Sequence, residues 1–240
     1  AVIVVGGRGS RLKPVTCNLP KPLVKVNGIP FLYYLFRQIY GAGIKKIILL
    51  TGYLGNEFEK FKESYTSEFS DLNITIIKSN PNLDTGERLL NSFEILDERF
   101  LFLYGDNYAP FDLENYINKY WNKKDNSYIL LYKNDDGYSK SNITISKDHL
   151  ILKYGKEKNS GANFVDIGYF ILNKRDLIKF KNNIGTNFGK HILKSLVKDK
   201  KIYGEVVHQR YYTVGTMERL QLTKLLMSLI HISEPTRPTW

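Results

Sequence analysis

Cysteine, methionine and tryptophan are scarce in this sequence of 240 residues, which contains one, two and two of them respectively. The single cysteine, Cys17, excludes an internal disulfide and a zinc site built from several thiolates. No run of about 18 consecutive apolar residues occurs, so we expect no transmembrane helix. No secretory leader is recognisable either. We therefore expect a cytoplasmic protein with no membrane partner.

Positive charge, in contrast, is abundant. Lysine and arginine number 35 against 24 acidic residues, which gives a formal net charge of +11. Such an excess can indicate nucleic-acid binding. However, the lysine pairs at 45–46, 123–124 and 200–201 are scattered along the chain and do not fall on one predicted face. We therefore expect a solvated surface that helps to attract anionic substrates, and no nucleic-acid partner.

Segments typical of strands and helices alternate through the first half of the chain. This alternation predicts a largely parallel sheet with helices on both faces. After residue 127 the strands become shorter and turns more frequent. The expected strands are 1–5, 45–50, 73–78, 100–104, 128–132, 143–146, 150–154, 165–172 and 202–207, and the expected helices are 31–40, 56–68, 85–96, 188–198 and one that begins at residue 217.

A glycine-rich loop follows the first apolar segment. Glycine adopts positive φ and lacks a Cβ, so the backbone here can close around a triphosphate with its N–H groups pointing inward. A serine adds a hydroxyl donor, and an arginine and a lysine add permanent positive charge. The candidate nucleotide-binding residues of this stretch are Gly6, Gly7, Gly9, Ser10, Arg11 and Lys21.

Two common glycine-rich motifs do not fit this loop. A dinucleotide-binding fingerprint needs a third glycine where this chain has Leu12, and an acid where it has Thr51 and Gly52. A P-loop needs Gly-Lys-Ser or Gly-Lys-Thr at its end, and neither triplet occurs in the sequence. The loop therefore belongs to neither class.

Three motifs in order resemble the signature of the sugar-1-phosphate nucleotidyltransferases. They are Gly-Gly-Arg-Gly-Ser-Arg-Leu at 6–12, Pro-Lys-Pro at 20–22 and Gly-Ile-Pro at 28–30, with Ser10 in place of threonine as the single departure. The residues at 106–108 and 213–216 resemble those of a bacterial subgroup near the D-glycero-D-manno-heptose 1-phosphate guanylyltransferases. The resemblance implies an α/β fold, namely a three-layer α/β/α Rossmann-like nucleotidyltransferase fold with a mostly parallel, mixed central sheet.

The reaction that this resemblance implies is Mg²⁺-dependent transfer of a nucleotidyl group from an NTP to a sugar-1-phosphate, giving an NDP-sugar and pyrophosphate. The attacking phosphate oxygen is already ionised at neutral pH, so the reaction needs positioning and charge neutralisation, not a general base. The resemblance gives the catalytic roles to Arg11 on the β- and γ-phosphates, Lys21 at the reacting centre, and Asp106 as the Mg²⁺ ligand.

Positions 81–86 resemble the loop of the family that recognises the nucleobase, and Thr85 and Gly86 are its expected nucleotide contacts. Glu87 departs from the family, which usually has a small residue there. Its carboxylate either selects a base or begins the following helix, near whose N-terminus a negative charge is favourable. The identity of the base is open.

The sugar side is expected at Lys156, which the resemblance places on the sugar phosphate, and at Asp166. Asp166 lies inside an apolar strand, where a carboxylate is unfavourable unless it is paired. It is therefore a sugar-hydroxyl or metal ligand, or a satisfied structural carboxylate. Gly155 and Thr213 stand where many family members have an acid, so one sugar contact and a second metal ligand are missing.

The domain organisation follows from length and composition. A chain with 42% hydrophobic residues can bury one large core. We expect one nucleotidyltransferase domain over 1–227, with a nucleotide-binding half at 1–125 and a sugar-phosphate-binding half at 126–227. Residues 228–240 resemble a translated sequencing adapter and are expected to be a non-native tail, so a C-terminal fusion domain remains open, as does a homo-oligomer. The alternatives are transfer to a small non-sugar phosphate, or a catalytically weak binding module.

Overall fold

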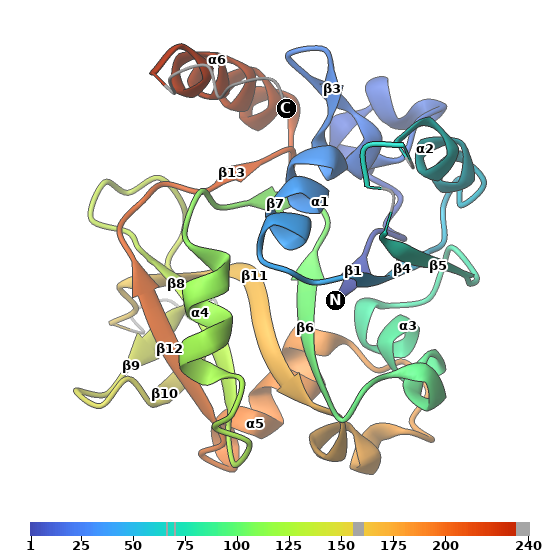
Figure 1. The fold of residues 1–240 in the computed structure, drawn as a ribbon. Coiled ribbons are helices and arrows are strands. Elements are labelled where there is room, and N and C mark those ends of the chain that lie inside the picture. Colours follow the sequence, from blue (N-terminus) through green and yellow to red (C-terminus); the bar gives the residue numbers. More distant parts are fainter. Residues whose placement is uncertain (66, 70, 156–160, 234–240) are drawn as a thin grey trace.

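A nine-stranded sheet forms the centre of the molecule (Figure 1). The computed structural model describes residues 1–65, 67–69, 71–155 and 161–233. The strands of this sheet are β1 (Val2–Val4), β4 (Lys46–Thr51), β5 (Asn73–Lys78), β6 (Arg99–Tyr104), β8 (Ser127–Lys133), β9 (Ile143–Ile145), β10 (Ile151–Tyr154), β11 (Phe164–Asn173) and β12 (Ile202–Val207).

Seven of the nine strands of this sheet point in the same direction, and β10 and β11 point in the opposite one. Strand β1 pairs in parallel with β4 and β6, β4 with β5, and β8 with β12. Strand β11 lies between β6 and β8 and is antiparallel to both, and β9 and β10 continue the sheet with antiparallel pairs. The sheet takes strands from both halves of the chain. It is mixed and mostly parallel, which confirms the expected fold class.

Helices cover both faces of the sheet. Because side chains alternate along a strand, Ile3 packs into one apolar cluster, whereas Val2 and Val4 pack into a second one on the opposite face. The molecule is therefore built in three layers, as expected. The first cluster includes residues of α1 (Phe31–Gly41), α2 (Glu57–Tyr65) and α4 (Leu113–Tyr120), and the second includes residues of α3 (Thr85–Asn91), η6 (Phe188–Leu193) and α5 (Lys194–Lys198).

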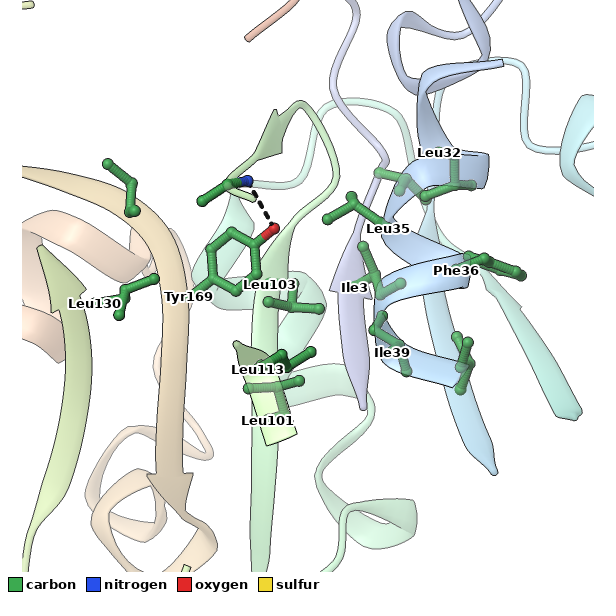
Figure 2. Close-up of a cluster of buried hydrophobic side chains, with 14 of the residues drawn as sticks. Ile3, Leu32, Leu35, Phe36, Ile39, Leu101, Leu103, Leu113, Leu130 and Tyr169 are labelled. Atoms are coloured by element: carbon green, nitrogen blue, oxygen red, sulfur yellow. Dashed lines mark hydrogen bonds between the residues drawn. The ribbon is translucent and has the colours of Figure 1, made fainter. Parts of the chain in front are cut away.

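One face of α1 is fully apolar and packs on the sheet. Leu32, Leu35, Phe36 and Ile39 recur at a spacing of three or four residues and are at most 1% exposed. Figure 2 shows Leu35 and Ile39 beside Ile3 of β1. Each buried side chain of this kind contributes about 1.5–3 kcal/mol through the hydrophobic effect. The packing holds β1 in place, and the glycine-rich loop leaves from its end.

A third apolar cluster lies beside the sheet and supports the same loop. It joins α6 (Met217–Ser233) to β2 (Lys25–Val26) and to β13 (Tyr212–Thr213), and it includes Leu12, Leu220 and Met227. In Figure 1, α6 lies near β3 (Ile29–Pro30) and β13. Helix α6 continues past residue 227, the predicted end of native sequence, and 234–240 lie outside the described residues.

The sequence predicted most elements within a few residues and missed some. The helix expected over 85–96 is divided into α3 and a short turn, η4 (Phe93–Ile95), and at the break the hydroxyl of Ser92 donates to the carbonyl of Leu89 at 2.8 Å. Helix α4 was missed, as was the pairing of β7 (Asn107–Tyr108) with β13. No helix in the described ranges has the length and apolar character that a membrane crossing requires.

Candidate active site

A cleft of about 620 Å³ opens at the carboxyl ends of β1 and β6. Open α/β sheets bind ligands at this edge. Tyr104, Asn187 and Gly215 line the cleft together with most of the site residues that the sequence predicted. The predicted residues in its lining are Gly7, Gly9, Ser10, Arg11, Lys21, Thr85 and Asp106.

The glycine-rich loop is fixed by its own hydrogen bonds. Gly9 has a left-handed φ of 61°, and its carbonyl accepts from the Leu12 N–H and from the Thr16 hydroxyl, both at 2.8 Å. Leu12 is fully buried, whereas Ser10 and Arg11 are exposed. The short turn η1 (Ser10–Leu12) therefore anchors one side chain in the core and leaves the two polar ones at the cleft.

Lys21 and Asp106 form an ion pair within the cleft. Lys21 lies between Pro20 and Pro22 at the start of the turn η3 (Lys21–Leu23), and the restricted backbone of the prolines directs its side chain. Asp106 follows Gly105 directly after β6. The side chain of Lys21 is 12% exposed and that of Asp106 is 34% exposed. Both charged groups thus stay accessible from the cleft while each neutralises the other.

Two arginines of the glycine-rich loop add positive charge. Within the described ranges, neither Arg8 nor Arg11 forms an ion pair. The guanidinium of Arg8 donates to Asn82 Oδ1 at 2.6 Å and so connects this loop with the loop expected at the nucleobase. Because the charge of Arg11 has no carboxylate partner there, the cleft carries an excess of positive charge that suits a polyphosphate.

The start of α3 shows what Glu87 does. Its Oε2 accepts from the Asp84 N–H at 2.9 Å and completes a capping box. Its Oε1 accepts from the Gly185 N–H at 2.7 Å. Both carboxylate oxygens are therefore in use. Of the two roles left open by the sequence, this geometry supports the start of the helix.

Thr85 and Gly86 differ in their surroundings. Thr85 lines the cleft, in agreement with a nucleotide contact. Gly86 is buried against another segment, because a Cβ at this position would lie 2.3 Å from the carbonyl oxygen of Thr186. Only glycine allows these two segments to approach so closely. The predicted contact of Gly86 with the nucleotide thus has no support from the lining of the cleft.

A buried arginine that the sequence analysis missed lies behind the glycine-rich loop. Arg88 is 3% exposed, and a Cβ at Gly6 would lie 2.6 Å from its guanidinium, so Gly6 packs on Arg88 and does not line the cleft. An arginine beside Leu89 and Leu90 in an apolar helix face was the available signal. The guanidinium donates at 2.5–3.1 Å to Thr51 O, Ser79 Oγ, Pro81 O and Leu83 O.

Asp166 is not among the residues that line the cleft. Its carboxylate accepts from the Gly168 N–H at 2.8 Å and from the Tyr154 hydroxyl at 3.3 Å. Burial raises the pKa of Asp166 to about 6, although these two hydrogen bonds act in the opposite direction. Its negative charge contributes to the raised pKa of Tyr104, mainly a result of burial. Lys156 lies outside the described residues.

Thr213 lies beside the metal-ligand candidate because two distant segments pair. Strand β13 pairs with β7, with Thr213 opposite Asn107, and the Val214 N–H donates to the Asp106 carbonyl at 3.2 Å. The backbone of the segment that carries Thr213 thus lies next to Asp106, although Thr213 is not among the residues that line the cleft. No sequence signal indicated this pairing, since the two strands are very short and far apart along the chain.

The donor set of the cleft fits a hard, oxygen-binding cation with few protein ligands. Asp106 supplies a carboxylate, and the described residues contain no cluster of three or more His, Cys, Asp or Glu side chains that would form a complete metal cage. Magnesium commonly binds through one or two carboxylates, with substrate phosphates and water completing its octahedron. The residues present are thus suited to Mg²⁺ that arrives with a triphosphate.

Backbone amides, an arginine and a lysine at the carboxyl edge of an α/β sheet define a nucleotide-binding enzyme whose chemistry takes place at phosphate. The chain belongs to the nucleotidyl transferase family, whose sequence model matches residues 1–225. The family predicted from the glycine-rich loop and its neighbouring motifs is therefore confirmed.

Relatives and solved structures agree with this assignment. The chain is 27% identical over 235 residues to the "Probable glucose-1-phosphate cytidylyltransferase" of Bacillus subtilis, with 90% of this chain and 89% of the relative covered. It is 24% identical over 216 residues to the D-glycero-alpha-D-manno-heptose 1-phosphate guanylyltransferase of Aneurinibacillus thermoaerophilus, with 90% and 92% covered. The crystal structure of HddC from Yersinia pseudotuberculosis has the same fold, with a TM-score of 0.80, 22% identity, and 94% and 98% covered.

Proposed function

We propose that this nucleotidyltransferase transfers a nucleotidyl group from a nucleoside triphosphate to a sugar-1-phosphate and releases pyrophosphate. The observation that carries this proposal is the convergence of the glycine-rich loop, Arg11, Lys21 and Asp106 on one cleft. The relatives named above support a sugar-1-phosphate as the acceptor, since their names specify glucose-1-phosphate and a heptose 1-phosphate. These two relatives differ from each other in both base and sugar.

The reaction forms a bond between a sugar-phosphate oxygen and the α-phosphorus, and breaks the bond from the α-phosphorus to the bridging oxygen of the leaving pyrophosphate. No proton has to be removed from the nucleophile, so the reaction needs no histidine as a base. The ring nitrogen Nδ1 of His191 accepts from the Asn187 N–H at 2.9 Å, and Nδ1 of His149 lies 3.1 Å from the Gly204 carbonyl oxygen. In each of these two rings, Nδ1 is engaged with a backbone group.

The residues of the cleft supply positioning and charge. Backbone N–H groups of the loop and the Ser10 hydroxyl hold the triphosphate, and Arg11 binds its β- and γ-phosphates. Lys21 leaves Asp106 to bridge the two anionic substrates at the α-phosphorus, which lowers their mutual repulsion. Asp106 would hold Mg²⁺, which supplies charge neutralisation on the triphosphate when bound. Lys156 would bind the sugar phosphate, and Asp166 would accept from a sugar hydroxyl.

Pyrophosphate release by the whole chain tests this proposal, measured with Mg²⁺, four nucleoside triphosphates and a panel of sugar-1-phosphates that includes heptoses. Turnover should depend on one sugar, and Asp106→Asn should lower kcat by at least about 100-fold with an unchanged circular dichroism spectrum. Asp125→Asn, at a carboxylate whose side chain is 99% exposed, is the matched control. Turnover by Asp106→Asn at the wild-type rate would refute the assigned role.

A second candidate function rests on Thr213 and Gly155, the two positions where an acid is missing. A binding module that has lost turnover would bind a triphosphate in equilibrium dialysis and release no pyrophosphate with any acceptor. Transfer to a small non-sugar phosphate would instead show as turnover with a phosphorylated alcohol and none with the sugars. The same panel of acceptors therefore separates the three functions.

A further inference from the structure

The segment 185–190, which we call the bridging segment, runs between the two substrate halves of the cleft. At one end it meets the start of α3, where Asn187 Nδ2 donates to Asp84 Oδ1 at 2.9 Å. At the other end a Cβ at Gly189 would lie 3.0 Å from the hydroxyl of Tyr154, which in turn donates to Asp166. The bridging segment therefore touches both the side expected for the nucleobase and the side expected for the sugar.

Within the bridging segment, Asn187 lines the cleft and Phe188 anchors the chain beneath it. Phe188 is fully buried, with its ring centroid 4.7 Å from that of Phe102 and 5.1 Å from that of Phe170. Thr186, directly before Asn187, is also buried, whereas Ile184 and Gly185 at the entrance to the segment are exposed. Asn187 is held by its own hydrogen bonds to Asp84, Lys190 and His191, so the exposed entrance at Gly185 is the part of the segment that needs a further contact.

Glu87 holds that exposed side. One carboxylate oxygen accepts from Asp84 within the capping box, and the other accepts from the Gly185 N–H at 2.7 Å. The close approach of Gly86 to the Thr186 carbonyl forms a second contact of the same two segments. A small residue at position 87 could not span both donors. The carboxylate of Glu87 therefore joins the base loop to the bridging segment at Gly185, in addition to the hydrogen bond from Asn187 to Asp84.

We propose that Glu87 is a positioning residue whose carboxylate clamps the bridging segment to the start of α3, so that the nucleobase side and the sugar-phosphate side of the cleft keep one fixed spacing. This inference rests on the proposed function for the identity of the two sides. Glu87 does not line the cleft. A substitution of Glu87, on the nucleobase side, is nevertheless expected to alter the affinity for the sugar-1-phosphate.

Glu87→Gln isolates the clamp from the helix start. Glutamine at this position completes a capping box as well as glutamate does, so its oxygen stays with the Asp84 N–H. Its amide group then faces the Gly185 N–H, and two donors oppose each other. Glu114→Gln is the matched control, because it removes the same charge in the first turn of α4. Glu87→Ala, which removes both hydrogen bonds, provides the comparison for loss of the capping box.

Amide hydrogen exchange tests the clamp without any substrate. We expect exchange in peptides covering 185–190 to become at least about fivefold faster in Glu87→Gln, as for loss of one hydrogen bond, and to stay unchanged in Glu114→Gln. Wild-type exchange rates in Glu87→Gln would overturn the proposal. This measurement is independent of turnover, so it decides on the clamp even if no acceptor supports catalysis.

Steady-state kinetics test the coupling. In Glu87→Gln we expect KM to rise about three- to tenfold for both the triphosphate and the sugar-1-phosphate, with kcat within about twofold of the wild type. A rise in the triphosphate KM alone would overturn the coupling between the two sides. Absence of wild-type turnover with the whole panel would instead overturn the proposed function, and it would leave the exchange result on the clamp intact.

Discussion

Substitution of Asp166 by asparagine should stabilise the protein at neutral pH. The carboxylate meets two hydrogen-bond donors and, among the described residues, forms no ion pair. Its pKa is raised from 3.8 to about 6 by burial, a difference that corresponds to about 3 kcal/mol. Part of the surface of Asp166 remains exposed to solvent, which weakens the effect of burial. The expected gain in the free energy of unfolding is therefore about 1–2 kcal/mol. Asparagine keeps the shape, accepts from Gly168 and donates to the Tyr154 oxygen.

The pH dependence of this gain has a definite sign. The folded protein binds a proton at Asp166 more tightly than the unfolded chain does, so between about pH 4 and pH 6 its stability falls as the pH rises. The advantage of Asp166→Asn should therefore be absent near pH 4 and complete above about pH 7. The neighbouring titratable groups, Tyr104 and Tyr154, have raised pKa values and stay neutral over this range.

Urea unfolding followed by circular dichroism at pH 4.5, 6 and 8 measures the effect, with Asp125→Asn as the exposed control. A loss of more than about 1 kcal/mol at pH 8, or a difference independent of pH, would refute the reasoning, since it would mean that the charged carboxylate is stabilised by its surroundings.

A carboxylate that destabilises the fold is retained for function. The KM for the sugar-1-phosphate should therefore rise in Asp166→Asn, which separates a sugar ligand from a structural carboxylate.

Two further substitutions test other parts of the site. Arg88→Met should lower the free energy of unfolding by about 2–4 kcal/mol, because it leaves the four acceptors of the guanidinium without their donor; an unchanged urea midpoint would contradict this role. Thr213→Asp should lower the Mg²⁺ concentration for half-maximal activity by at least about threefold, because it adds a carboxylate beside Asp106. A Mg²⁺ titration that coincides with that of the wild type would exclude Thr213 from the metal site.

The sequence predicted the parts of the site that depend on neighbours along the chain. The strand 1–5, the glycine-rich loop and Lys21 belong to one continuous stretch, and Asp106 follows a buried strand, so local pattern and motif spacing were sufficient. Helix α4 could have been predicted as well. Asp112 accepts from the Asn115 N–H at 2.9 Å as an N-cap, and Leu113, Tyr116 and Tyr120 recur on its buried face.

The parts that the sequence did not reveal depend on contacts between distant residues. Thr213 reaches Asp106 through the pairing of β7 with β13, and two-residue strands carry no periodicity that could predict a partner. Glu87 meets Gly185 by the same kind of long-range approach. Each of these contacts needs the complete sheet to bring its two segments together. A motif can identify the residue types of a site, but such tertiary contacts decide which of them meet.

The ion pair of Lys21 and Asp106 has a consequence for how substrates enter the cleft. Removing either partner alone leaves a partly buried charge without its counterion, which is unfavourable. A triphosphate without a metal would draw Lys21 away and leave Asp106 facing the negative phosphates. A metal without a triphosphate would occupy Asp106 and leave Lys21 beside a cation. A metal–triphosphate complex gives each group a partner of opposite charge in one step, so the resting ion pair favours the complex over either component.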